Sequence, residues 1–400
     1  MSKAETAPTL IVPLANWGRL AANSTAHMTE HLFNAVIAVI LPIMTTALGL
    51  SLAQAGALAS ARTLMAGVAS FPSGFFADLA RRRNLLLGAC TALIGLGALG
   101  LSASSSFPLL MIFMGLSGFG GGWFHPQSLA ILSARYREQK AFALGVHDSS
   151  ANLGEVIGPL AIGLLLNFFD WRSALIIWAI PGIVVGLCYA LWGAERALAA
   201  APPARDYRRA ILNDVLKNRA VCGLMVVSTL RAMGQTALAS FLPLYLSLHL
   251  KLPAAVAGAY MSVLFLFAGV APAFVGWISD RFGHRLLIVV FSLLSAAAVV
   301  SMPILGSGAI LVVGLALLGA LLWALRPVIV SAAMSSAPQE LSGSIVAFIY
   351  GANMSASFLA PLLAGLIADA YGLPIALTAI AFFPLSAAAL TFMLLQSARK

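Results

Sequence analysis

The sequence predicts an all-α membrane protein whose twelve transmembrane helices form two pseudo-symmetric six-helix bundles. The first observation is composition: 61% of the 400 residues are hydrophobic and only 9% are charged, and the mean hydropathy is +0.97, whereas about a quarter of the residues in a soluble chain are charged. The second is that apolar runs of about 20 residues, each long enough to cross a hydrocarbon core of about 30 Å, recur along the chain. The third is an internal duplication.

Charged or turn-forming segments separate the apolar runs and so define the spans. These breaks include ARRRN at 80–84, SARYREQK at 133–140, NFFDWRS at 167–173 and SDRFGHR at 279–285. The expected spans are, in order, 17–47, 52–79, 84–103, 107–134, 141–167, 172–194, 219–247, 253–279, 286–303, 307–337, 342–368 and 373–396. The Pro-containing stretch 195–218 is the predicted linker between an N-terminal bundle, 1–194, and a C-terminal bundle, 219–400.

Basic residues predict the orientation of the chain in the membrane. With a cytoplasmic N-terminus, the outer loops hold only Arg172 and Lys251, and every other basic residue outside the spans falls in an inner loop or tail. Because cytoplasmic loops carry an excess of Lys and Arg, we expect both termini in the cytoplasm, in a bacterial inner (plasma) membrane. The net charge of +10 then lies beside anionic lipid headgroups, so no nucleic-acid partner is indicated.

The duplication relates the two halves of the chain in four blocks of similar sequence. The matched pairs are 74–86 with 276–288, 41–58 with 242–259, 124–134 with 325–335, and 158–165 with 360–367. All four pairs occur in the same order and nearly the same register, which indicates that six spans were duplicated. Many transporters are built from two such repeats around a binding site at the bilayer midplane.

These blocks resemble the major facilitator superfamily, whose hallmark after the second span is a Gly-x-x-x-Asp pattern followed by basic residues. The second copy matches well, through Gly276, Asp280, Arg281, Gly283 and Arg285. The first copy keeps Gly74, Asp78, Arg82 and Arg83, with Leu79 and Arg81 where a basic residue and a glycine are usual. The resemblance implies the major facilitator fold. It also implies conformational gating by Gly74, Asp78, Arg82, Gly276, Asp280, Arg281 and Arg285, since glycine permits close helix packing and the aspartate caps a helix and pairs with basic residues.

A second resemblance lies in the fifth span, GVHDSSANLGEVIGPLAIG, which is similar to the G-x8-G-x3-G-P-x2-G-G pattern of proton-coupled exporters in that superfamily. The positions that match are Gly145, Gly154, Gly158, Pro159 and Gly163, whereas Ile162 does not. The pattern implies gating by Gly154, Gly158 and Pro159, and simple helix packing is the alternative. With the His-Pro pair at 125–126, the region resembles the fosmidomycin-resistance exporter branch.

The stretch HMTEH at 27–31 matches the H-x-x-E-H pattern of a class of zinc peptidases. Such a site needs a third protein ligand from a distant helix, an open coordination position and a cleft for a peptide. A short motif in the cytoplasmic half of the first span does not supply these, so we expect neither a metal nor catalysis. No P-loop is present, so ATP-driven transport and cofactors are not expected either.

Ionisable side chains within spans are costly and therefore mark candidate functional positions. They are His27, Glu30, His31, Arg62, His125, His147, Asp148, Glu155, Arg231 and Arg326. The duplication relates Glu30 to Arg231 and His125 to Arg326, each pair 201 residues apart. The resemblance implies that the four spans that carry them, the first, fourth, seventh and tenth, line a central cavity.

The chemistry of these groups suggests two sets of roles. Arginine has a fixed charge and a planar fork that fits carboxylate or phosphate, so the predicted substrate-binding residues are Arg231 and Arg326, with His27, Gln127 and Asn152. Glutamate and histidine titrate near neutral pH when their surroundings shift them, so the predicted proton-coupling residues are Glu30, His31, His125 and Glu155.

Each role has a structural alternative. Glu30 and Arg231 could form an ion pair between the bundles, and Arg62 could brace acidic neighbours. Gln127 and Asn152 could hydrogen-bond between helices. His147 and Asp148, near the cytoplasmic end of the fifth span, could form a hydrated gate or cap.

The sequence therefore predicts a secondary transporter that works by alternating access, as a proton-coupled antiporter that exports small, anionic molecules or drugs. Its partners are a small-molecule substrate, protons and the lipid bilayer, and the expected state is monomeric. The first alternative is an importer or exchanger of organic anions. The second is a membrane sensor that binds a ligand without transporting it.

Overall fold

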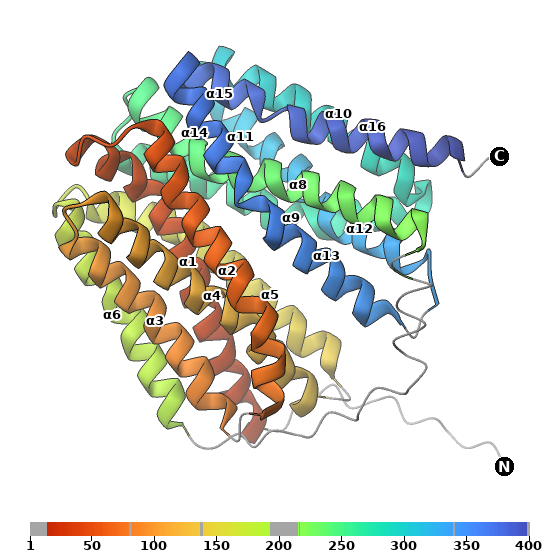
Figure 1. Cartoon of the computed structure of the whole chain (residues 1–400), viewed down its shortest axis with the longest axis horizontal. Coiled ribbons are helices and arrows are strands. Elements are labelled where there is room, and N and C mark those ends of the chain that lie inside the picture. Colours follow the sequence, from red (N-terminus) through yellow and green to blue (C-terminus); the bar gives the residue numbers. More distant parts are fainter. Residues whose placement is uncertain are drawn as a thin grey trace.

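The computed structural model describes residues 14–79, 82–136, 139–192, 215, 217–338 and 341–397. Long helices run side by side through this part of the chain (Figure 1). In the first half they are α1 (Leu14–Ala47), α2 (Leu52–Leu79), α3 (Arg83–Ala103), α4 (Phe107–Arg135), α5 (Lys140–Leu165) and α6 (Trp171–Leu191). The prediction of an all-α membrane protein is confirmed.

In the second half, most helical columns are built from two consecutive pieces. Among the described residues of this half, only α9 (Ala254–Phe282) forms a column alone. The composite columns are α8 (Arg219–Leu244) with η2 (Tyr245–His249), α10 (His284–Ser301) with η3 (Met302–Ile304), α11 (Ala309–Leu322) with α12 (Leu325–Met334), α13 (Ser342–Ser357) with α14 (Leu359–Tyr371), and α15 (Leu373–Ala379) with α16 (Phe382–Ser397). Most of the predicted linker 195–218 lies outside the described residues.

Ten of these columns, among the described residues, are long and apolar enough to cross a membrane. The other two, α2 and α5, are 28 and 26 residues long and pack lengthwise against α4 and α1. They are less apolar because polar side chains interrupt them, Arg62 in α2 and His147 and Glu155 in α5 among them. Both helices thus carry polar side chains of the interior, and together with the other ten columns they correspond to the twelve predicted spans.

Local sequence explains where individual helices begin and end. The Asp170 carboxylate accepts hydrogen bonds from the backbone N–H groups of Arg172 and Ser173, at 2.9 and 3.2 Å, and from the Ser173 hydroxyl at 2.6 Å. This is an N-cap for α6, and the bonds from Ser173 lower the pKa of Asp170. Between α9 and α10 the chain turns at Gly283, whose φ of 88° favours glycine.

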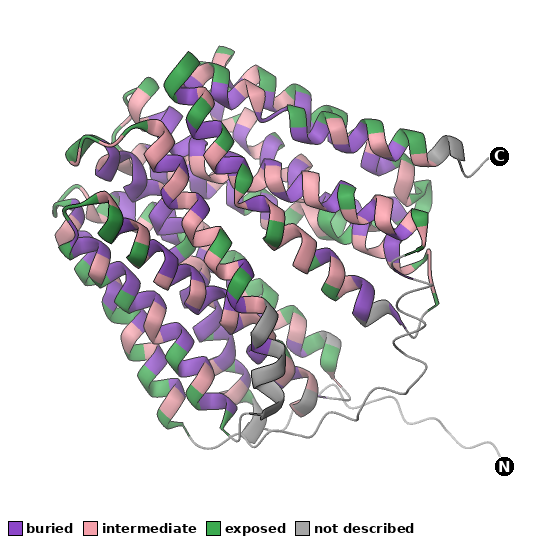
Figure 2. Ribbon diagram, in the orientation of Figure 1, coloured by how far each residue is buried: buried purple, intermediate pink, exposed green. Residues whose placement is uncertain are grey.

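The outer faces of the helices carry large apolar side chains. Leu191, Phe274 and Ile304 are 81%, 63% and 81% exposed, and Figure 2 shows exposed positions along the outer sides of the helices and buried positions between them. An apolar exterior of this kind suits lipid, whereas the polar groups of the spans lie among the helices.

The two halves of the chain make their closest contacts where α2 meets α14 and where α5 meets α9. A side chain added at Gly56 would collide with the carbonyl oxygen of Pro361, and one at Gly258 would collide with that of Pro159. Gly258 and Pro361 each lie 202 positions after Gly56 and Pro159. The two contacts are therefore equivalent under the duplication, and Pro159 lies at an interface between the halves.

Hydrogen bonds reinforce the contact between α2 and α14. The Asp369 carboxylate accepts from the backbone N–H groups of Leu52 and Ala53, at 2.8 and 3.0 Å, so α14 caps the first turn of α2. The Ser60 hydroxyl donates to the carbonyl oxygen of Phe358 at 2.5 Å. From this end of the molecule the two groups of helices diverge toward the ends at which α1 begins and α16 finishes (Figure 1).

We expect Gly258→Ala to weaken the contact between α5 and α9, because the added methyl group meets the Pro159 carbonyl and overpacking costs about 1–3 kcal/mol. The readout is the labelling rate, by a water-soluble thiol reagent, of a cysteine introduced as Ser60→Cys after the three native cysteines are changed to serine. Labelling should rise roughly tenfold. Gly351→Ala is the matched control, because nothing lies within 4 Å of its added Cβ; equal labelling in both variants would contradict the prediction.

Candidate functional site

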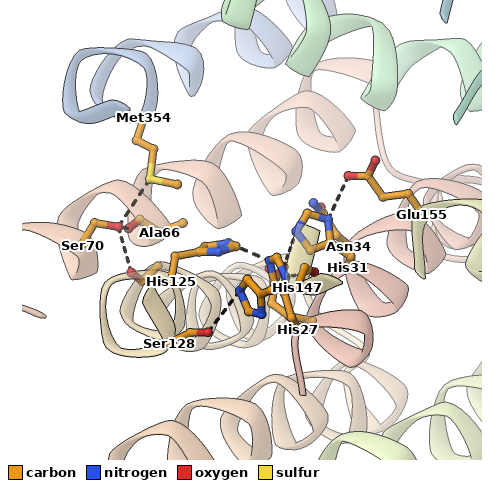
Figure 3. Close-up of polar contacts among 12 residues, drawn as sticks. His27, His31, Asn34, Ala66, Ser70, His125, Ser128, His147, Glu155 and Met354 are labelled. Carbon is orange, nitrogen blue, oxygen red and sulfur yellow. Dashed lines mark hydrogen bonds and ion pairs between the residues drawn. The ribbon is translucent and has the colours of Figure 1, made fainter. Parts of the chain in front are cut away.

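A cluster of ionisable side chains from α1, α2, α4 and α5 lies in the interior of the first half of the chain. The imidazoles of His27, His31, His125 and His147 lie together, with Glu155 beside His31 and Ser128 beside His147 (Figure 3). The ring centroids of His27 and His147 are 3.7 Å apart and nearly parallel, and those of His27 and His125 are 5.3 Å apart. The fold thus brings together residues that lie up to 124 positions apart in the sequence.

Glu30 lies at the centre of this cluster, with a side chain only 5% exposed. Its Oε1 lies 3.5 Å from Nη2 of Arg62, and Nη1 of Arg62 donates to Oδ1 of Asn34 at 2.6 Å. Its Oε2 lies 3.3 Å from Nε2 of His31 and 3.7 Å from Nε2 of His125. A carboxylate buried at this depth needs cationic or hydrogen-bonding partners, and Arg62 is the partner with a fixed charge.

Two histidines are held in place by groups on α5. The Nδ1–H of His27 donates to the backbone carbonyl of His147 at 2.9 Å, because a carbonyl oxygen can only accept. Nδ1 of His31 lies 2.9 Å from Oε1 of Glu155. These contacts are possible because α5 packs closely on α1 at glycine: a Cβ at Gly154 would lie 2.5 Å from the carbonyl oxygen of Met28.

A chain of buried hydrogen bonds continues from His147 toward α6. The Ser128 hydroxyl donates to Oδ1 of Asn23 at 2.7 Å and lies 3.1 Å from Nε2 of His147. The Asn23 amide donates to the Tyr189 hydroxyl at 3.3 Å. His147 is 1% exposed, so in this conformation it is a buried side chain that links helices rather than one that faces a cavity.

The second half of the chain contributes two arginines. Arg231 on α8 is 3% exposed, and its Nε and Nη1 have no hydrogen-bond partner among the described residues. Arg326 is exposed and lies in the first turn of α12, just after the break from α11. Arg326 and Tyr350 lie within electrostatic range of Arg231. This half therefore presents cationic groups, where the other half presents Glu30 and the histidines.

The break between α11 and α12 has a sequence cause. Pro327, in the first turn of α12, has no N–H to donate and its ring disfavours a helical residue before it. The N–H of Arg326 reaches only the carbonyl of Trp323, at 3.4 Å. The N-terminus of α12, with its partial positive charge, consequently lies beside the Arg326 guanidinium.

The remaining predicted site residues have different surroundings. Gln127 is fully buried and donates to the carbonyl oxygen of Ser73 at 2.7 Å, which is the interhelical hydrogen bond considered as its alternative role. Asn152 is exposed and faces Gly269 of α9 across the two halves. The ion pair between Glu30 and Arg231 that was considered as an alternative is not formed among the described residues; Glu30 pairs with Arg62.

The residues assigned to gating fall into two groups. Gly158 packs on α1, where an added Cβ would lie 3.0 Å from the carbonyl oxygen of Leu32. Gly276, in contrast, has nothing within 4 Å of an added Cβ, so close packing does not explain this glycine in the present conformation. The guanidinium of Arg281 lies 4.0 Å from the ring centroid of Trp277. Of the other gating residues, Asp280 and Arg82 are exposed and Arg285 is half-buried, and the surroundings of Gly74 and Asp78 lie outside the described part of the chain.

Several residues of the site were not predicted. Asn34, Ser128 and Asn23 are uncharged, so a search for ionisable groups in spans passed over them. Asn34 could have been found, because it lies one helical turn after Glu30 on the same face of α1. The contact of Ser128 with Asn23 joins α4 to α1 and has no signal in the sequence alone.

Comparison with known proteins identifies related sequences and folds. The family model described as Major Facilitator Superfamily matches residues 24–361 and 224–400. The uncharacterized MFS-type transporter YfnC of Bacillus subtilis (strain 168) is 26% identical over 90% of this chain and 88% of its own length. The multidrug resistance protein MdtG of Citrobacter koseri is 24% identical over 79% of each chain.

Solved structures share the fold. A bacterial homologue of the human lysosomal transporter Spinster, in an inward-facing and occupied conformation, superposes with a TM-score of 0.82 over 96% of this chain and 97% of its own, at 17% sequence identity. The similarity extends over both halves, so the helices described above have the same arrangement in that protein.

We expect Arg62→Ala to destabilise the protein, because it leaves the buried Glu30 carboxylate without its fixed positive partner. Removing one member of a buried ion pair costs about 3–5 kcal/mol, and the nearby His31 should reduce that cost. The measurement is the thermal unfolding temperature of purified protein in detergent. The double variant Arg62→Ala with Glu30→Gln should unfold closer to the wild-type temperature; a double variant no more stable than Arg62→Ala would contradict the role of Arg62.

Proposed function

Because the chain belongs to the major facilitator superfamily and is therefore a membrane transporter, we propose that it is a proton-coupled antiporter that exports small, anionic molecules or drugs. The observation that carries this proposal is the division of charge between the halves. Glu30 and His125 lie in the first half, and at the positions related to them by the duplication the second half has Arg231 and Arg326. One half can exchange protons, and the other offers fixed cations to an anion.

Anion binding is supported by the state of the two arginines. Guanidinium groups form paired, charge-assisted hydrogen bonds with carboxylate and phosphate. Nε and Nη1 of Arg231 are buried without a hydrogen-bond partner in the described residues, and buried donors of this kind are normally satisfied. A carboxylate, phosphate or phosphonate group of a substrate would supply the acceptors, with Asn152, exposed on the facing half, as a further contact.

Proton coupling is supported by the surroundings of Glu30. Its Oε2 is 3.3 Å from His31, and His31 in turn is bound to Glu155. In this arrangement a proton can be held by Glu30 or by either neighbouring histidine, and its presence changes the charge that faces the arginines. Protonation of the first half and binding of an anion in the second then affect each other electrostatically, so the proton and the anion are coupled through charge.

Alternating access would arise from movement of the two halves about this site. The halves touch at the end that carries residues 48–51 and 250–253, where Lys251 is the one basic residue. Because loops poor in basic residues face outward, we place this end outside, with both termini in the cytoplasm of a bacterial inner membrane. The conformation is then closed to the outside, and the glycine and proline contacts at Gly56 and Gly258 are its outer gate.

An exchanger or importer of organic anions is the second candidate. It would use Arg231 and Arg326 in the same way and would not need the proton at Glu30. The resemblance to fosmidomycin-resistance exporters and the similarity to the multidrug resistance protein MdtG favour export. We propose a monomer as the working unit, since each chain carries both halves of the site.

Proton movement in everted membrane vesicles tests the antiport directly. On addition of fosmidomycin or another organic anion from a panel, we expect proton release from the lumen, which a fluorescent pH probe in the lumen would report. Glu30→Gln should abolish this release, because glutamine cannot ionise. Asp170→Asn is the control, since Asp170 lies in a loop and asparagine also caps helices well. Anion exchange without any proton signal would favour the exchanger.

Substrate affinity tests the arginines separately. We expect Arg231→Gln and Arg326→Gln each to weaken binding of a transported anion by roughly 10- to 150-fold, because a hydrogen bond to a charged group contributes about 1.5–3 kcal/mol. Equilibrium binding of the labelled anion to purified protein is the measurement. Arg219→Gln is the control on the same helix, where Arg219 is exposed in the first turn. Equal affinities in all three variants would exclude an anion site at these arginines.

A further inference from the structure

We propose that His27, His31, His125 and Glu30 form a binding site for a divalent transition-metal ion such as Zn²⁺, Co²⁺ or Ni²⁺. The ligand atoms of the three histidines all lie within 4.8 Å of one another. The expectation of no metal site rested on the lack of a third ligand from a distant helix. The fold supplies that ligand, because α4 brings His125 to the two histidines of α1.

The first argument is the orientation of the imidazoles. Metal-bound histidines almost always donate their second N–H to a backbone carbonyl, a carboxylate or water. Nδ1–H of His27 donates to the carbonyl oxygen of His147, and Nδ1 of His31 lies 2.9 Å from a carboxylate oxygen of Glu155. Both contacts leave Nε2 as the free nitrogen. The outer groups of a metal site are thus already in place for two of the three histidines.

The second argument is the position of Glu30. Its Oε2 has no hydrogen-bond partner among the described residues, although the side chain is buried, with only 5% of it exposed. This oxygen lies 3.3 Å from Nε2 of His31 and 3.7 Å from Nε2 of His125. Ligand atoms on a tetrahedral Zn²⁺, with bonds of about 2.0–2.2 Å, lie about 3.3–3.6 Å apart. Both of these separations are close to those of a metal site. The histidine nitrogens lie up to 4.8 Å apart, so the widest pair must close by about 1 Å when an ion binds.

The third argument is ligand type and access. Three imidazoles with one carboxylate suit zinc, cobalt and nickel rather than calcium or magnesium, which prefer oxygen ligands. Arg62 occupies only Oε1 of Glu30, so Oε2 stays available. The side chains of His31 and His125 are 19% and 31% exposed, which gives an ion a route into the cluster.

This inference goes beyond the proposed function, because an ion can bind at equilibrium whether or not the protein transports anything. It also restricts what the cavity can hold, since a bound ion would add positive charge close to Arg62. An anionic substrate group would then meet the metal on one side and the arginines of the second half on the other.

The test is metal binding by the purified full-length protein in detergent, after removal of any histidine tag. Titration with CoCl₂, followed by visible absorption, reports the coordination of the ion, and elemental analysis after dialysis against ZnCl₂ reports its stoichiometry. We expect one ion per chain. His31→Gln and His125→Gln should abolish specific binding, and Glu155→Ala, which removes the group that orients His31, should weaken it by about 10–100-fold.

Two matched controls separate this site from adventitious binding. His147→Gln changes a histidine of the same cluster whose Nε2 lies against Ser128, and His249→Gln changes one that stacks on Tyr245 in the other half. Both variants should bind the ion within about threefold of wild type. Absence of one bound ion per chain, or equal losses in His249→Gln and His31→Gln, would overturn the proposal. Vesicle proton release is measured independently, so either proposal can fail while the other stands.

Discussion

The burial of the Glu30 carboxylate is the constraint on which the interior of this protein depends. An ionised carboxylate within a membrane-spanning helix requires compensation from nearby cations or hydrogen-bond donors. Arg62 on α2 provides the fixed charge, and His125 on α4 lies 3.7 Å from Oε2 of Glu30, so α2 and α4 turn polar side chains toward α1. This requirement explains why α2 carries Arg62 in its middle, whereas large apolar side chains lie on the outer faces, which suits lipid.

Two helices of the first half, α2 and α5, meet the second half of the chain through contacts that leave no room for an added side chain. Gly56 lies against Pro361 and Gly258 against Pro159, so two backbone surfaces come into direct contact at one end of the molecule. Backbone packing this close is possible only when the two surfaces meet fully, so such an interface is either closed or separated. Because α5 carries both Pro159 and Glu155, movement at this interface is connected mechanically to the histidine cluster.

Much of this organisation follows from the sequence. Hydropathy defines the spans, and the duplication pairs Glu30 with Arg231, because both patterns depend only on the positions of residues along the chain. The partner of Glu30 was harder to identify, because Arg62 lies on another helix and nothing in spacing tells which helices touch. At Gly276, a sequence pattern typical of close helix packing occurs where nothing lies within 4 Å of an added Cβ in this conformation. The third histidine near His27 and His31 likewise required the fold, because α4 follows α1 by almost 100 residues.

The two halves carry different ionisable groups, so they differ in how their charge responds to a proton or a bound ion. The second half carries arginines at the positions where the first half carries Glu30 and His125, so the charge of the first half depends more on what its side chains hold. Whatever the cluster holds changes the charge of the first half, whereas an empty cluster leaves Glu30 paired with Arg62 alone as its fixed cation. If both halves carried a glutamate at these related positions, or both carried an arginine, the two halves would not differ in charge in this way.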